Sequence, residues 1–281
     1  MEQVIRDEIR RFVQESPDNR FPDGDRPYFD EPLVGFAAAD DPLFARYRQV
    51  IGPFHLTPAE IMANAYGEGV GAARTVICWI LPVAREVRAS NRREEREPSR
   101  EWALTRAHGE RFNTLLRMHV VEMLRWVSAQ AVAPLLCGVW RPVRDPRVGM
   151  ASTWSERHAA YAAGLGTFGL SDGFITARGI AHRCGSVVTD VELPPTPRSC
   201  TDHRGDCLFF RDGSCGLCIE RCPVGAISRQ GHDKDRCQAH VYGHLRAIAA
   251  ERYGVMESGC GLCQTRVPCE SRIPRAATVD G

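Results

Sequence analysis

Cysteine placement is the feature that most constrains this chain. Nine of its 12 cysteines lie between Cys200 and Cys269, and three are scattered through residues 1–199. The proline-rich segment 193–198 immediately precedes the dense region, and consecutive prolines interrupt both helix and sheet. We therefore expect two domains, residues 1–198 and residues 199–281. In a reducing compartment, clustered cysteines are metal ligands or redox groups more often than disulfides.

The stretch from Cys215 to Cys222 has the spacing C-x2-C-x3-C-P of one half of a bacterial ferredoxin motif. A short turn in this motif lets its first two cysteines reach one cubane cluster, while the cysteine before proline points toward a second cluster. The motif normally begins with a cysteine where this chain has Asp212. The nearest upstream substitute is Cys207, with Cys200 behind it.

The cysteines further downstream form an irregular second half of the motif. In two-cluster ferredoxins the last cysteine of each half binds the cluster of the other half. The predicted ligands of the first [4Fe–4S] cluster are Cys207, Cys215, Cys218 and Cys269. The predicted ligands of the second are Cys222, Cys237, Cys260 and Cys263. Whether Cys200 or Cys207 is the first ligand stays open. Structural zinc is the competing interpretation, but it does not explain the C-x3-C-P spacing.

Residues 1–198 alternate one-sided helices with buried strands, which predicts a layered α/β fold. A helix is expected to start at Thr57, because Glu60 completes a capping box. Buried strands are expected over 75–81 and 135–140, and an extended run over 184–193. The charge-dense segment 85–100 is interpreted as a solvated loop.

Charge composition excludes several classes of function. Lys234 is the single lysine among 36 basic residues, and aspartates flank it. A phosphate-binding G-K-[ST] loop is therefore excluded, and Schiff-base chemistry has no other lysine to use. The net charge is +1, so no global field attracts the chain to anionic surfaces. No signal peptide is recognisable and no apolar run reaches the roughly 18 residues that span a bilayer. We expect a cytoplasmic protein with no membrane partner.

A family resemblance extends over residues 100–270. Residues 155–169 read SERHAAYAAGLGTFG, and their G-x-G-x-x-G follows a helix instead of the strand that a dinucleotide fold requires. Residues 185–194 read GSVVTDVELP, and the ferredoxin cysteines follow. In this order, the three segments resemble the epoxyqueuosine reductase family, whose members are distant relatives of reductive dehalogenases.

The resemblance implies a nitroreductase-like α/β (α+β) domain that holds a base-off cobalamin, followed by a bacterial-type two-cluster ferredoxin domain that reduces its cobalt. The residues that it places near the corrinoid are Gly164, Leu165, Gly166, Thr167 and Gly169. The implied function is that of an iron–sulfur oxidoreductase. It would take electrons from an external low-potential donor and pass them to a small-molecule or protein redox partner.

The chain also departs from the family pattern. Met150 stands where the family has a catalytic aspartate, and the nearest acid is Asp145. The candidate proton-transfer residues are Asp145, His158 and Tyr161. Because the net charge is +1 and no basic stripe is visible, tRNA is not expected as a partner. An alternative function is electron transfer to, or reductive activation of, another corrinoid protein, with no substrate of the chain's own.

Overall fold

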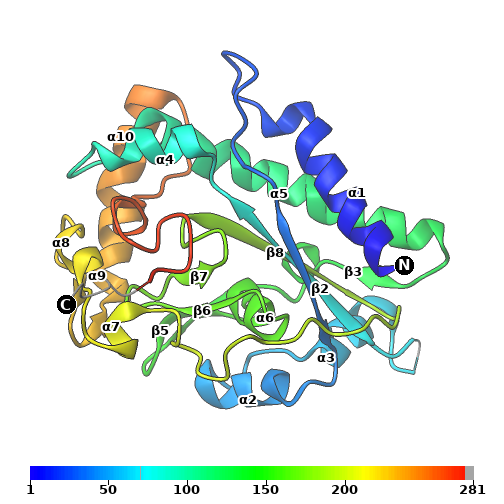
Figure 1. Cartoon of the computed structure of the whole chain (residues 1–281). Coiled ribbons are helices and arrows are strands. Elements are labelled where there is room, and N and C mark those ends of the chain that lie inside the picture. The colour runs from blue at the N-terminus through cyan, green and yellow to red at the C-terminus, as the bar shows by residue number, and fades with distance from the viewer. Residues whose placement is uncertain (70, 276–281) are drawn as a thin grey trace.

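A four-stranded antiparallel sheet forms the centre of the molecule (Figure 1). The computed structural model describes residues 1–69 and 71–275. In spatial order, the strands are β1 (Leu33–Ala38), β2 (Thr75–Pro82), β8 (His182–Thr189) and β3 (Ala131–Val132). Each neighbouring pair is antiparallel. The predicted mixture of helix and sheet is confirmed, as are the predicted strands over 75–81 and most of 184–193.

Strand β2 lies at the middle of the core, since all eight of its residues are buried. Successive side chains of a strand point to opposite faces. Ile77 and Trp79 accordingly pack in one apolar cluster, while Val76 and Cys78 pack in another on the other face. Gly185 pairs with Trp79 across the sheet, and a Cβ at this glycine would lie 2.3 Å from the indole ring. The tryptophan therefore requires glycine opposite it.

Helices cover both faces of the sheet (Figure 1). One face carries α1 (Glu2–Glu15) and the long helix α5 (Arg100–Trp126), whose buried residues share a cluster with the sheet. The other face carries α2 (Pro42–Val50), α3 (Pro58–Tyr66) and α6 (Glu156–Ala162). Helix α3 begins with the capping box that the sequence predicts. Among the described residues, no helix combines the length and apolar character needed to span a membrane.

Smaller elements complete the first part of the chain. The hairpins pair β4 (Pro142–Asp145) with β5 (Gly149–Ser152) and β6 (Gly166–Phe168) with β7 (Phe174–Thr176). Short 3-10 turns span Pro17–Asn19 and Pro134–Leu136.

Two local predictions are wrong. The segment 135–140 is not a strand, because Pro134 opens a 3-10 turn and the pairing with β8 ends at Val132. The segment 85–100 is not all loop, because α4 spans Arg85–Arg92. Its Val87, Ser90 and Asn91 are buried on one side while the charges remain on the other. Helical periodicity therefore overrides the high charge density of this stretch.

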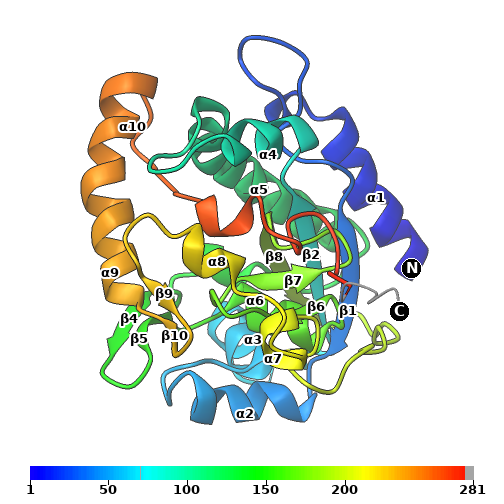
Figure 2. The ribbon, with the colours of Figure 1, turned by 60° about the vertical axis from the view of Figure 1, so that its left-hand side comes forward.

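The cysteine-rich part consists of short elements joined by turns. Its helices are α7 (Leu208–Arg211), α8 (Leu217–Glu220), α9 (Lys234–Gln238) and α10 (Arg246–Tyr253), with a π-helix over Ala239–Leu245 and a 3-10 turn over Leu262–Gln264. Its strands are β9 (Ile227–Ser228) and β10 (Gly231–His232). The segment from α9 through the π-helix to α10 forms one column along the side of the molecule (Figure 2).

Buried polar contacts attach the cysteine-rich part to α4. The Arg221 guanidinium donates to the carbonyl of Leu262 within its own part and, at 2.8 Å, to that of Glu94 in the other. The carboxylate of Glu270, which is 2% exposed, accepts from Arg92 Nε at 2.7 Å. The backbone N–H of Ile180 donates to the carbonyl of Cys269 at 2.8 Å. The two parts of the chain therefore pack as one body.

Candidate metal centres

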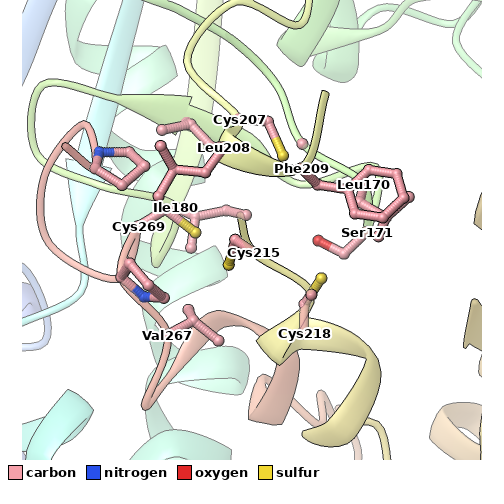
Figure 3. A pocket seen from close by; sticks show the side chains of 15 residues that line it. Leu170, Ser171, Ile180, Cys207, Leu208, Phe209, Cys215, Cys218, Val267 and Cys269 are labelled. Atoms are coloured by element: carbon pink, nitrogen blue, oxygen red, sulfur yellow. The ribbon is translucent and has the colours of Figure 1, made fainter. Parts of the chain in front are cut away.

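The first group of four cysteines surrounds a small apolar hollow (Figure 3). Its members are Cys207, Cys215, Cys218 and Cys269. They come from the start of α7, the turn before α8, α8 itself and the loop near the end of the described chain. The hollow has a volume of about 30 Å³ and is lined otherwise by apolar groups such as Leu170, Ile180 and Val267. The structure thus brings together the four cysteines that the sequence assigns to one cluster.

Cys200 does not line this hollow. It is half-buried, and its Sγ lies 3.3 Å from the carbonyl oxygen of Asp202. Cys207 stands at the N-cap of α7 and lines the hollow. Of the two alternatives that the spacing leaves open, the geometry favours Cys207.

The second group lies beside the first. Its members, Cys222, Cys237, Cys260 and Cys263, line one cavity of about 280 Å³. Gly261 sits between two of them with a φ of +64°, and a Cβ there would lie 2.0 Å from the Trp102 ring. Backbone conformation and the tryptophan both require glycine at this point of the C-x2-C turn.

Burial opposes ionisation of the cysteine thiols. It raises the pKa of Cys218 and of Cys269 to about 12, and the neighbouring cysteines of the first group add to the effect. In the second group burial raises the pKa of Cys260 to about 11, and it raises the pKa of the Cys263 thiol well above its usual value. Cys218 of the first group contributes to the shift at Cys263, so the two groups lie close together. Bound metal would supply the positive charge that these sulfurs need to be thiolates.

Spacing within the groups is wider than a single ion requires. In residues 1–69 and 71–275, no three His, Cys, Asp or Glu side chains are arranged around one metal-ion position. The sulfurs line hollows instead of meeting at a point. Cysteines disposed around a hollow fit the donor set of an iron–sulfur cluster, which is held by four thiolates.

The second cavity extends beyond its cysteines into a space that we call the polar chamber. The basic residues that line the chamber are Arg106, Arg157, Arg183, His182, His232 and His240. Among the described residues that line it, none is Asp or Glu.

Two of these histidines have opposite protonation behaviour. Burial lowers the pKa of His182 to about 4, and its Nε2–H donates to the carbonyl of Phe174 at 2.7 Å. Burial also acts against the charged form of His232. Hydrogen bonds to Asp172 and Cys237 outweigh it and raise the pKa of His232 to about 9. The chamber therefore carries positive charge from His232 as well as from its arginines.

The residues proposed for proton transfer lie elsewhere. Asp145 ends β4 and pairs with Arg147 at 3.5 Å. His158 lies on α6, where burial lowers its pKa to about 3 and Ser155 Oγ is 2.8 Å from its Nδ1. Tyr161, on the same helix, donates its hydroxyl to the carbonyl of Thr201 at 3.1 Å. None of the three lines either cysteine cavity, and Asp145 lies on β4 whereas the other two share α6.

The glycine loop packs against the chain itself. Gly164, with a φ of +71°, follows the end of α6, and a Cβ there would lie 2.7 Å from the Pro197 carbonyl oxygen. A Cβ at Gly166 would lie 2.0 Å from that of Ile175. Leu165 and Thr167 do not line either cavity, and Gly169 lines only the first hollow. The sequence reasoning instead missed the chamber's arginines, because 35 arginines leave no signal that singles out three.

Comparisons with known proteins confirm the family resemblance. No family model matches the chain. An epoxyqueuosine reductase of Bacillus anthracis is 30% identical over 119 residues, which are 41% of this chain and 29% of that protein. The chain thus spans less than a third of the curated relative that it matches.

Solved structures show the same fold over most of the chain. An epoxyqueuosine reductase of Bacillus subtilis superposes with a TM-score of 0.56 at 16% identity, covering 98% of this chain and 66% of that one. A reductive dehalogenase described with a mechanism for B12-dependent dehalogenation gives a TM-score of 0.52 at 13% identity, covering 88% and 30%.

The prediction about tRNA is contradicted. An epoxyqueuosine reductase solved with an epoxyqueuosine-modified tRNA stem loop gives a TM-score of 0.53 at 16% identity and covers 96% of this chain and 65% of that one. The expectation rested on a net charge of +1, which is a sum over the whole chain. Such a sum does not report how basic residues are distributed over the surface, so it was not a sound basis for excluding a nucleic acid.

Proposed function

We propose that this relative of the epoxyqueuosine reductases is a reductive enzyme that carries two [4Fe–4S] clusters. The observation that carries the proposal is the sorting of eight cysteines into two adjacent groups, each around its own hollow. Four thiolates per cluster is the ligand set that such clusters require. The ferredoxin-like unit would comprise residues 199–281, and the nitroreductase-like unit residues 1–198.

The two hollows suggest a direction for the electrons. The first is small and apolar, and only the second continues into the polar chamber. Electrons from an external low-potential donor would therefore reach an acceptor by way of the second cluster. Because each cluster passes one electron at a time, two clusters allow a two-electron reduction to proceed in successive steps.

Cobalamin is the acceptor that the family resemblance suggests. The loop assigned to it, Gly164–Gly169, does not fit this role in the structure, because the chain's own backbone fills the space at Gly164 and Gly166. The loop also does not line the polar chamber. We therefore derive no step through a corrinoid. Cobalt analysis of protein prepared with corrinoid supplied tests this point directly.

The relatives support an enzyme over a carrier without its own substrate, since the curated ones are named reductases. A tRNA stem loop is a candidate macromolecular substrate because a structural neighbour was solved with one. Binding of a modified tRNA stem loop, followed by anaerobic turnover with a low-potential donor, distinguishes this activity from simple electron transfer. Reduction and reoxidation of the clusters with no product from any substrate would favour the carrier instead.

Metal content tests the cluster assignment. Anaerobically reconstituted protein should contain about eight irons and no zinc per chain. Cys218→Ser should lower the iron content by about half and remove one of the two reduced-cluster signals in electron paramagnetic resonance. Cys200→Ser is the matched control and should retain full iron, because this cysteine lies outside both hollows. Full iron in the first variant, or equal loss in both, would refute the assignment.

A further inference from the structure

The two hollows provide an internal comparison. Both are bordered by four cysteines, but the first measures about 30 Å³ and the second about 280 Å³. The first hollow therefore gives the volume that four cysteines enclose when no further cavity adjoins them. The second therefore has room beyond a cluster, and its volume is just below the range of about 300–1,000 Å³ for small-molecule sites.

Two of the arginines that line the additional space have only distant counter-charges. Arg106 Nη2 lies 3.8 Å from Glu257, and Arg183 Nε lies 3.8 Å from Glu110, so both ion pairs are loose. Burial lowers the pKa of Arg183 to about 10, and the Arg106 guanidinium adds to the shift. Two like charges thus line one partly desolvated space. An anion between them would relieve their repulsion.

Three buried polar atoms at the chamber have no hydrogen-bond partner among the described residues. They are Thr105 Oγ1, Arg106 Nη1 and His240 Nε2. Thr105 is 3% exposed, so water does not readily replace a partner for its hydroxyl. An unpaired buried polar group costs about 1–3 kcal/mol. These three atoms make the wall of the chamber polar, as an anionic ligand requires.

The Arg106 guanidinium is held in place for such a ligand. Its side-chain stem packs against Gly259, where an added Cβ would lie 3.1 Å from its Cγ and Cδ. Gly259 immediately precedes Cys260 of the second group. The contact with Gly259 therefore holds the Arg106 side chain beside the second cysteine group.

We propose that the polar chamber binds the carboxylate or phosphate group of a small-molecule electron acceptor through Arg106 and Arg183. The inference rests on the proposed function for the second cluster as the neighbour that delivers electrons. The anion site itself stands on the arginines and on the lack of Asp and Glu among the described residues that line the chamber. A small molecule is favoured because the two arginines are half-buried and line a cavity of about 280 Å³.

Titration of inorganic phosphate and, separately, succinate into the anaerobically reconstituted protein tests this inference. Calorimetry at low ionic strength gives the dissociation constant, and electron paramagnetic resonance of the reduced protein reports whether the second cluster senses the anion. Arg106→Gln and Arg183→Gln should each weaken binding of at least one anion about tenfold or more, as expected for a charge-assisted hydrogen bond. Arg111→Gln is the matched control, because this exposed arginine lies on the same helix and does not line the chamber.

Several results would overturn the inference. These are no binding of either anion, equal binding by all three variants, or displacement of the bound anion by cobalamin or a tRNA stem loop at the same site. If the arginine variants bind the anions as the parent does but give a changed cluster signal, the arginines only balance the negative charge of the cluster. Iron content separates the two proposals: protein without iron refutes the proposed function, whereas arginine-dependent phosphate binding by that protein still supports the anion site.

Discussion

Replacement of Gly261 by alanine should selectively damage the second cysteine group. This glycine lies between Cys260 and Cys263 with a φ of +64°. A Cβ would also lie 2.0 Å from the Trp102 ring, which is 7% exposed and packed in the core. The substitution therefore combines backbone strain with a steric overlap that the buried ring cannot avoid without repacking.

The two contributions can be separated by a matched glycine. Gly254 has a φ of +67°, and an added Cβ there has nothing within 4 Å. Gly254→Ala should thus cost only the left-handed backbone penalty of about 1–2 kcal/mol. Gly261→Ala adds an overpacking cost of about 1–3 kcal/mol, for a total of about 2–5 kcal/mol. The extra cost falls on the C-x2-C turn itself.

Iron content and the rate of cluster loss provide the assay. Cluster proteins seldom unfold reversibly, so the loss of cluster absorbance in urea is followed as a rate under anaerobic conditions. Gly254→Ala should retain about eight irons per chain. Gly261→Ala should retain about half of them. It should also lose its remaining absorbance faster than the control.

A double variant tests the cause. Combining Gly261→Ala with Trp102→Leu removes the ring from the space that the new Cβ needs, so it should recover iron relative to Gly261→Ala alone. The reasoning is refuted if the two glycine variants behave alike. It is also refuted if shortening Trp102 gives no recovery while the Trp102→Leu variant by itself loads iron normally.

Three further predictions concern stability. Glu270→Gln should lower the anaerobic thermal midpoint by the equivalent of about 3 kcal/mol, because Arg88 and Arg92 lose the charge of a buried carboxylate; an unchanged midpoint would contradict this. Burial raises the pKa of Glu156 from 4.5 to about 6, so this group stabilises the fold as the pH falls through that interval. The stability difference between Glu156→Gln and the parent should therefore change by about 2 kcal/mol between pH 4.5 and 7, and a constant difference would refute the assignment. Thr57→Ala should cost about 1 kcal/mol through loss of the capping box, measured as a lowered urea midpoint that Thr57→Ser largely restores.

The grouping of the cysteines was predictable because it follows from spacing. Four of the eight lie in short motifs where two neighbours share a turn, and the exchange of one cysteine between halves is a rule of the motif. The exchange places Cys269 with Cys207, as the structure does. Strand β2 was equally predictable, because an unbroken apolar run of this length is typical of a strand that is buried on both faces of a sheet.

The polar chamber could not be predicted in the same way. Arg106 comes from the second turn of α5 and Arg183 from β8, and the two residues are 77 positions apart in the chain. Only the packing of α5 on the sheet brings them together, and neither stands in a recognisable motif. Helix α4 was missed for a different reason, because its charges hid a buried side formed by Val87, Ser90 and Asn91.

The contrast between the two hollows has a consequence for timing. The described residues that line the small apolar hollow include no titratable group besides its cysteines, so the midpoint potential of a cluster there would vary little with pH. A cluster beside the polar chamber would have a potential that depends on what occupies the chamber, because nearby charge and hydrogen bonds to sulfur tune such centres. The first centre would then store an electron at a fixed potential, and arrival of a ligand at the second would determine when that electron moves.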